Sequence, residues 1–91
     1  MFKSINPFTG QVIATFQEST IQKVNEIIDK TDLAFQNWRM VKLTDRSLLM
    51  SGLAKILEKK KEKLGRLITA EMGKLIGESY AEIEKCAWLC K

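Results

Sequence analysis

The side chains with the greatest potential for covalent chemistry are two thiols near the end of the chain, Cys86 and Cys90. A thiol attacks as its thiolate, which needs a neighbouring base or cation to form at neutral pH. The sequence has no histidine, which excludes Cys-His and Ser-His-Asp arrangements, and Lys85 and Lys91 are weak activators. A spacing of four suits neither a disulfide within a regular helix nor, without other ligands, a zinc site. We interpret both thiols as buried and structural.

Glycines and carboxylates offer no alternative chemistry. Gly73-Lys74 matches the end of a phosphate-binding loop, but the upstream glycine spacing and the following Ser or Thr are missing. A helix stop followed by a solvated lysine is the simpler interpretation. Glu78, Glu82 and Glu84 suit an exposed, solvating helix face. We therefore predict no catalytic, cofactor-binding or metal-binding residue within this chain.

The charge pattern is mildly basic, with 15 Lys and Arg against 11 Asp and Glu. Much of the excess lies in the run 59–63 and in Arg66. This run contains no aromatic residue and is mixed with Glu58 and Glu62, so it indicates a solvated helix junction and no nucleic-acid partner. No apolar stretch approaches the roughly 20 residues that span a bilayer, and Pro7 interrupts the N-terminus early. We expect no membrane association and a cytoplasmic location.

A hairpin is predicted over residues 3–17. Asn6, Pro7 and Gly10 form a dense cluster of turn-forming residues, and the run 11–16 is β-branched and ends in an aromatic residue. Both faces of this run are partly apolar. Because a lone hairpin is marginal in water, we expect it to pack on a larger body.

Four helices are predicted after the hairpin, at about 20–38, 45–58, 61–72 and 75–90. Ser19 with Gln22 fits a capping box for the first helix, and Thr44 can cap the second. Gly73 suits the left-handed stop of the third. Apolar residues recur every three to four positions and predict buried stripes. The second stripe comprises Leu48, Leu49, Leu53, Ile56 and Leu57, and the expected anchors are Phe35, Trp38, Leu49, Leu53, Ile83 and Trp88.

The last helix ends in five consecutive apolar residues, 86–90, without a Gly, Asn or Pro stop. Such an end leaves a bulky Trp88 and several carbonyl groups without partners. We expect that the chain stops where its fold does not. The fold class predicted from these elements is mainly α with an N-terminal β-hairpin.

Three stretches in order resemble the aldehyde dehydrogenase superfamily. Residues 4–15 are similar to its opening hairpin, N-P-A-T-G-E-V-I-A. Residues 34–38, followed by Arg46 and Leu49, resemble its A-F-x-x-W…R…L pattern, and 71–74 with 81–83 resemble E-x-G-K…E-x-E-[IV]. Phe8 and Leu75 depart from the usual Ala and Pro. The tail 84–90 is most similar to the bacterial succinate-semialdehyde dehydrogenase branch.

The resemblance implies an N-terminal fragment of an α/β, Rossmann-type fold, with residues 1–91 belonging to the cofactor-binding domain. It implies oxidation of an aldehyde to a carboxylic acid with NAD or NADP, through a Cys nucleophile and a Glu base that lie downstream in the family. Cys86 and Cys90 do not match that nucleophile. We expect the chain alone to be inactive and to bind no cofactor.

Two functions remain open from the sequence. The first is a truncated or fragmentary aldehyde dehydrogenase, such as a natural truncation, a frameshift product or a pseudogene remnant. Its partner would be the remainder of a dehydrogenase subunit, or a homo-oligomer formed through exposed apolar helix faces. The alternative is a small helical module that binds a protein or a nucleic acid.

Overall fold

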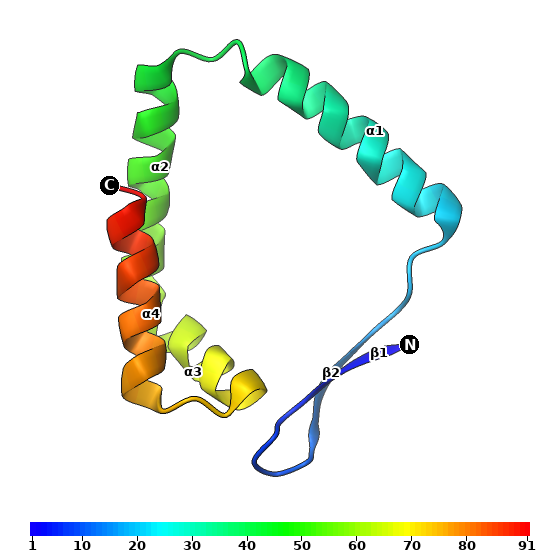
Figure 1. The fold of residues 1–91 in the computed structure, drawn as a ribbon, viewed down its shortest axis with the longest axis vertical. Helices are drawn as coiled ribbons and strands as arrows, with labels where there is room; N and C mark the ends of the chain where they lie inside the picture. Colours follow the sequence, from blue (N-terminus) through cyan, green and yellow to red (C-terminus); the bar gives the residue numbers. More distant parts are fainter.

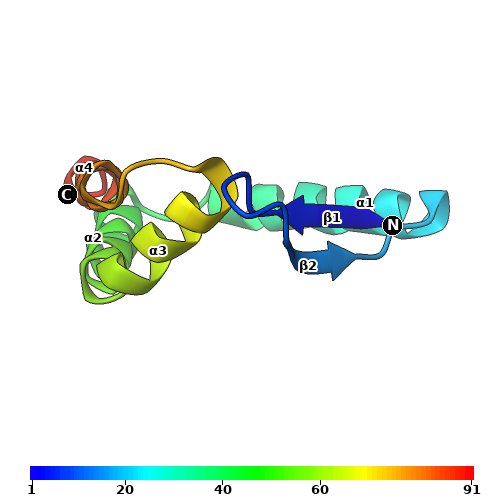
Figure 2. The same ribbon diagram turned by 90° about the horizontal axis from the view of Figure 1, so that it is seen from below.

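The computed structural model describes all 91 residues. The elements are β1 (Phe2–Ile5), β2 (Val12–Phe16), α1 (Ile21–Trp38), α2 (Leu43–Lys59), α3 (Lys61–Met72) and α4 (Ile76–Leu89). The chain is mainly helical with an N-terminal two-stranded antiparallel sheet, which confirms the predicted fold class. The elements follow one another around an open centre (Figure 1), in a layer with extents of 47 × 37 × 14 Å that Figure 2 shows from its edge.

The turn between β1 and β2 is held by local hydrogen bonds. The Oδ1 atom of Asn6 accepts from the backbone N–H groups of Phe8 at 2.9 Å and Thr9 at 3.3 Å. Gly10 has a φ of 74°, which a residue with a side chain rarely adopts. The strands pair with Phe2 opposite Phe16, and a bulge interrupts the register after Ser4. The turn is therefore stabilised by hydrogen bonds and a glycine conformation that are local in the sequence.

The helix caps differ from the prediction at two places. Thr20, and not Ser19, caps α1, because its hydroxyl accepts from the N–H of Lys23 at 3.1 Å. The helix α2 begins before Thr44, so this residue lies inside the first turn and no side chain caps that end. Gly73 ends α3 with a φ of 71°, as predicted for a left-handed stop. A stretch rich in Ser and Thr indicates that a helix begins there, but it does not show which of the neighbouring hydroxyl groups caps the helix.

The core lies between α2, α3 and α4 and is made of small residues. The five buried residues are Ala54, Gly65, Ser79, Ile83 and Ala87. At Gly65 an added Cβ atom would overlap the Tyr80 ring, so the glycine is what lets α3 and α4 approach. The hydroxyls of Thr69 and Ser79 share a hydrogen bond of 2.8 Å across the same contact. We call residues 43–89 the three-helix unit.

The remaining elements, residues 2–38, form what we call the open arm. The helix α1 buries none of its residues and makes at most slight contact with the other elements. The hairpin meets the three-helix unit at one point, where Pro7 lies beside Gly73. The expectation that the hairpin packs on a larger body is thus not met within this chain.

Most residues of the predicted apolar stripes are exposed within this chain. On α2 only Ala54 is buried, while the leucines and isoleucine at 48, 49, 53 and 56 are exposed. Of the six expected anchors only Ile83 is buried, and Trp88 is 69% exposed. The physical reason is that a stripe needs a second surface, and this chain provides one only between its last three helices. None of the helices combines the length and the apolar character that crossing a membrane requires.

Candidate functional site

The two thiols lie one turn apart at the end of α4, and both are free. Cys86 is exposed and Cys90 is half-buried, so the prediction of buried structural thiols is wrong for Cys86. The reason is that Ile83 and Ala87 occupy the face of α4 that packs inward, and Cys86 lies off that face. No hydrogen bond or ion pair links either sulfur to a basic side chain. Neither thiol therefore has a base or a cation in direct contact that would stabilise its thiolate.

The structure places Gly73 and Lys74 in a helix stop and not in a phosphate loop. Gly73 donates its N–H to the carbonyl of Thr69 at 2.9 Å, which closes the last turn of α3. Lys74 then pairs with Glu82 of α4, with 3.0 Å between Nζ and Oε2. Lys74 is thus held along the protein surface, so no cation is directed at a phosphate here.

The acidic residues of α4 hold helices together. Lys61 at the start of α3 donates a hydrogen bond of 2.8 Å to the carboxylate of Glu84. This hydrogen bond and the negative charge of Glu84 hold the pKa of Lys61 above its ordinary value of 10.5. Together with the Lys74–Glu82 pair, this contact connects the two ends of α3 to α4. The carboxylates are therefore structural partners, and no group of three metal-binding side chains exists in the chain.

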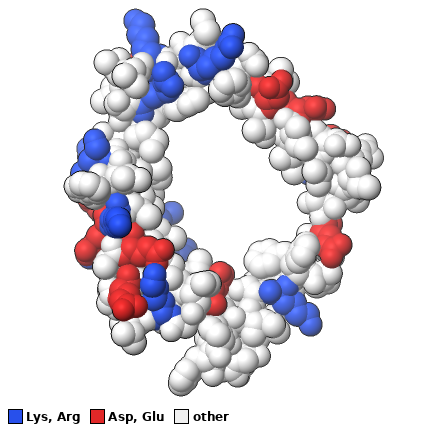
Figure 3. Space-filling model, viewed as in Figure 1, with Lys and Arg blue, Asp and Glu red and all other residues white.

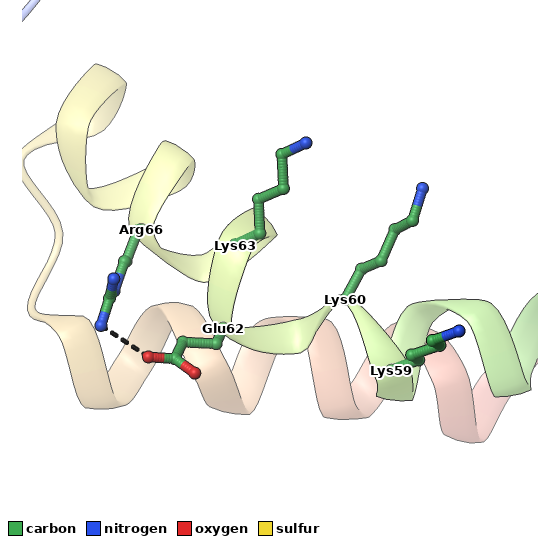
Figure 4. A pocket seen from close by; sticks show the side chains of 5 residues that line it. All are labelled: Lys59, Lys60, Glu62, Lys63 and Arg66. Atoms are coloured by element: carbon green, nitrogen blue, oxygen red, sulfur yellow. Dashed lines mark hydrogen bonds and ion pairs between the residues drawn. The ribbon is translucent and has the colours of Figure 1, made fainter.

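The lysine-rich junction of α2 and α3 surrounds an open hollow of about 570 Å³ (Figure 4). It is lined by Lys59, Lys60, Glu62, Lys63 and Arg66. Arg66 turns toward Glu62 and pairs with it, while Lys60 and Lys63 extend together to the other side (Figure 4). No aromatic side chain lines the hollow. The arrangement is that of a solvated junction, without the stacking groups that a nucleic-acid site uses.

The open arm presents an apolar surface without a partner in this chain. The face of α1 that the sequence marks as apolar carries Val24, Ile27, Ile28 and Phe35, all more than two-fifths exposed. The opening at the centre of the molecule persists when every side chain is drawn (Figure 3). Single exposed apolar residues are ordinary, but a continuous face of this length marks a contact surface.

A second hollow, of about 350 Å³, lies where α1 ends, α2 begins and α4 ends. Its walls include Trp38, Leu43, Met50 and Leu89, together with the guanidinium of Arg46. The Nε atom of Arg46 is buried and has no hydrogen-bond partner. In the sequence, Arg46 stands out only for its place in a motif, because the surroundings of its Nε atom depend on three helix ends that are distant in sequence.

These features define a class of protein segment: a thin packing layer with apolar faces and no group poised for reaction. The whole chain, residues 1–91, matches the aldehyde dehydrogenase family. The chain belongs to this family.

Individual relatives agree with this assignment. The chain is 36% identical over 88 residues to a probable NADP⁺ succinate-semialdehyde dehydrogenase of Synechocystis, covering 97% of this chain and 19% of that protein. It is 31% identical over 86 residues to the NADP⁺ succinate-semialdehyde dehydrogenase of Deinococcus radiodurans, covering 94% of this chain and 18% of that protein.

A solved structure shares the arrangement of the elements. It is the succinic semialdehyde dehydrogenase of Streptococcus pyogenes in complex with NADP⁺ as the cofactor, with a TM-score of 0.90 at 28% identity. The match covers 99% of this chain and 20% of that chain. The chain therefore spans about a fifth of the length of the relatives that it matches.

Proposed function

We propose that residues 1–91 form the N-terminal packing layer of the cofactor-binding domain in an aldehyde dehydrogenase subunit. The single observation that carries this proposal is the TM-score of 0.90 over 99% of the chain. An open layer with five buried residues has little internal packing to hold it in this shape. Its agreement with one fifth of a larger protein supports a role in which the rest of a subunit covers the apolar faces.

The reaction of the complete subunit is proposed to be oxidation of succinate semialdehyde to the acid. The activities of the relatives from Synechocystis, Deinococcus radiodurans and Streptococcus pyogenes support this substrate. NAD(P)⁺ would accept the hydride in such a reaction. The glycines of this chain do not fit a dinucleotide site, because none of its helices begins with a glycine-rich turn. The cofactor is thus assigned to the rest of the subunit.

We assign no reacting group to this chain. Oxidation of an aldehyde through a thioester needs an activated thiol and a base, and neither Cys86 nor Cys90 has a base in contact. The isolated chain is accordingly proposed to be inactive. Its contribution is to complete the packing of a domain whose catalytic groups lie elsewhere.

The test is reconstitution from two pieces. The Streptococcus pyogenes enzyme is made without the fifth of its chain that this protein matches, and the 91-residue chain is added in increasing amounts. We expect NADPH formation from succinate semialdehyde only in the mixture. The excised segment of the Streptococcus pyogenes enzyme serves as the positive control.

Two outcomes contradict the proposal. One is rescue by the excised segment but not by this chain, which would show that the shared fold does not extend to shared packing. The other is turnover by the isolated chain that persists in the double variant Cys86→Ser and Cys90→Ser, which would place a reacting group where we assign none.

The alternative of a small interaction module makes the opposite prediction for the isolated chain. Such a module folds cooperatively along its whole length, whereas a packing layer leaves the open arm with exposed apolar surface that binds an apolar dye. The exposure of α1 along its whole length favours the packing layer.

A further inference from the structure

The hollow between the ends of α1, α2 and α4 combines apolar walls with an unsatisfied cation. Trp38, Leu43, Met50 and Leu89 supply the walls. The Nε atom of Arg46 is buried without a hydrogen-bond partner, and none of the ion pairs in the structure includes its guanidinium. A buried donor without a partner is costly, so this edge of the guanidinium requires an acceptor.

Charge decides the kind of acceptor that fits. The residues lining the hollow include two cationic side chains, Arg46 and Lys91, and no Asp or Glu. Lys91 is already paired with Glu58 at 2.7 Å, which leaves Arg46 as the free positive charge. A guanidinium presents parallel N–H groups that match a carboxylate in a two-pronged contact. No side-chain hydrogen bond or ion pair of Arg46 has to break for its guanidinium to pair with a carboxylate.

We propose that this hollow is the docking site for a polypeptide segment that carries an Asp or Glu beside an apolar side chain, with Arg46 as its anchor. The apolar side chain lies against Trp38 and Leu89, and the carboxylate pairs with the guanidinium. The segment belongs to the rest of the dehydrogenase subunit, so the source of the occupant rests on the proposed function. The chemistry of the site rests on the hollow and on Arg46 alone.

The first test uses the reconstitution with three variants. Arg46→Gln removes the charge, Arg46→Lys keeps a charge but loses the two-pronged geometry, and Arg39→Gln is the matched control on an exposed arginine. We expect the concentration for half-maximal rescue to rise about tenfold or more for Arg46→Gln, to rise less for Arg46→Lys and to stay unchanged for Arg39→Gln. Equal behaviour of Arg46→Gln and Arg39→Gln overturns the inference while leaving the proposed function intact.

The second test uses the unaltered 91-residue chain, so it does not depend on the folding of a variant or on successful rescue. The probes are N-acetyl-Leu-Asp-amide and the matched neutral N-acetyl-Leu-Asn-amide, observed through the indole N–H signal of Trp38 in NMR spectra. We expect the Asp peptide to shift this signal in a saturable way and to bind at least about fivefold more tightly than the Asn peptide. Equal binding of the two peptides, or no shift with either, overturns the inference even if rescue succeeds.

Discussion

The open arm and the three-helix unit come from one amphipathic sequence, yet only one of them has an interior. The three-helix unit buries small residues such as Ala54, Gly65 and Ala87, which let helix backbones approach closely. The open arm carries larger apolar residues, including Ile28 and Phe35, and leaves them more than half exposed. Small residues thus mark contacts made inside this chain, and large ones mark contacts to be made with something else.

The difference also appears in the polar contacts. The Lys61–Glu84 ion pair and a hydroxyl–hydroxyl hydrogen bond connect α3 to α4, and Lys74 in the loop between them pairs with Glu82 of α4. The open arm has one ion pair, of 3.7 Å, between the N-terminal amine and Glu18. An element without tertiary contacts relies on its own backbone hydrogen bonds, and such helices are marginal in water. The three-helix unit should therefore carry nearly all of the stability of the isolated chain.

The largest expected effect comes from matched isoleucines in the two regions. Ile83→Ala should lower the free energy of unfolding by about 2–3 kcal/mol, because it removes buried methylenes and leaves a cavity. Ile28→Ala, at a position 58% exposed, should change it by less than about 0.5 kcal/mol. Urea unfolding followed by circular dichroism measures both. Similar losses for the two variants would mean that the open arm packs in solution.

A second pair of variants tests the close approach of α3 and α4. Gly65→Ala should destabilise the chain by about 1–2 kcal/mol, because the new Cβ overlaps the Tyr80 ring and outweighs the gain in helix propensity. Gly52→Ala, where no atom lies within 4 Å of the added Cβ, should stabilise it by up to about 1 kcal/mol. The measurement is the shift of the thermal unfolding midpoint. Stabilisation by both substitutions would contradict the close contact.

The smallest effect is the pH dependence of the Lys61–Glu84 pair. Because the pKa of Lys61 is held above its ordinary value of 10.5, the pair stabilises the fold fully below pH 10.5. Its contribution is lost as the pH rises through the higher pKa of the folded state. The free energy of unfolding of Lys61→Met should therefore be lower than that of the unaltered chain below pH 10.5. The two values should converge as the pH rises above 10.5.

The control for this measurement is Lys63→Met, which changes a lysine without an ion pair in the same turn of α3. It should show the same small difference in unfolding free energy at every pH. The pair is exposed to solvent and screened, so its contribution is modest. If the difference in unfolding free energy between Lys61→Met and the unaltered chain is the same on both sides of pH 10.5, the pair is not formed in solution.

Sequence patterns predicted the elements well because the signals were local. The turn at Asn6 and Gly10, the left-handed stop at Gly73 and the apolar periodicity of α1 each depend on residues a few positions apart. The capping residue of α1 was not predicted correctly, because Ser19 and Thr20 can both cap a helix. Thr20, and not Ser19, accepts the hydrogen bond from the N–H of Lys23. Boundaries therefore followed from the sequence to within a few residues, while the identity of a cap did not.

Burial could not be predicted in the same way, because it depends on which surfaces meet. The stripe of α2 indicated burial of its leucines, but the contact with α4 is made through Ala54 and Ala87. The unpaired Nε of Arg46 likewise arises from three helix ends that are distant in sequence. Periodicity shows that a face needs a partner. It does not show whether that partner lies in the same chain.

The separation of α1 from the other helices has a consequence for protein synthesis. Residues 2–38 leave the ribosome before the three-helix unit does, and at ordinary elongation rates the next ~50 residues take roughly 3–10 s. Throughout that time the nascent helix exposes Ile27, Ile28 and Phe35 with nothing of its own chain to cover them. The charged residues along the same helix, Lys23, Glu26, Asp29, Lys30 and Asp32, then act as gatekeepers that oppose aggregation of neighbouring nascent chains.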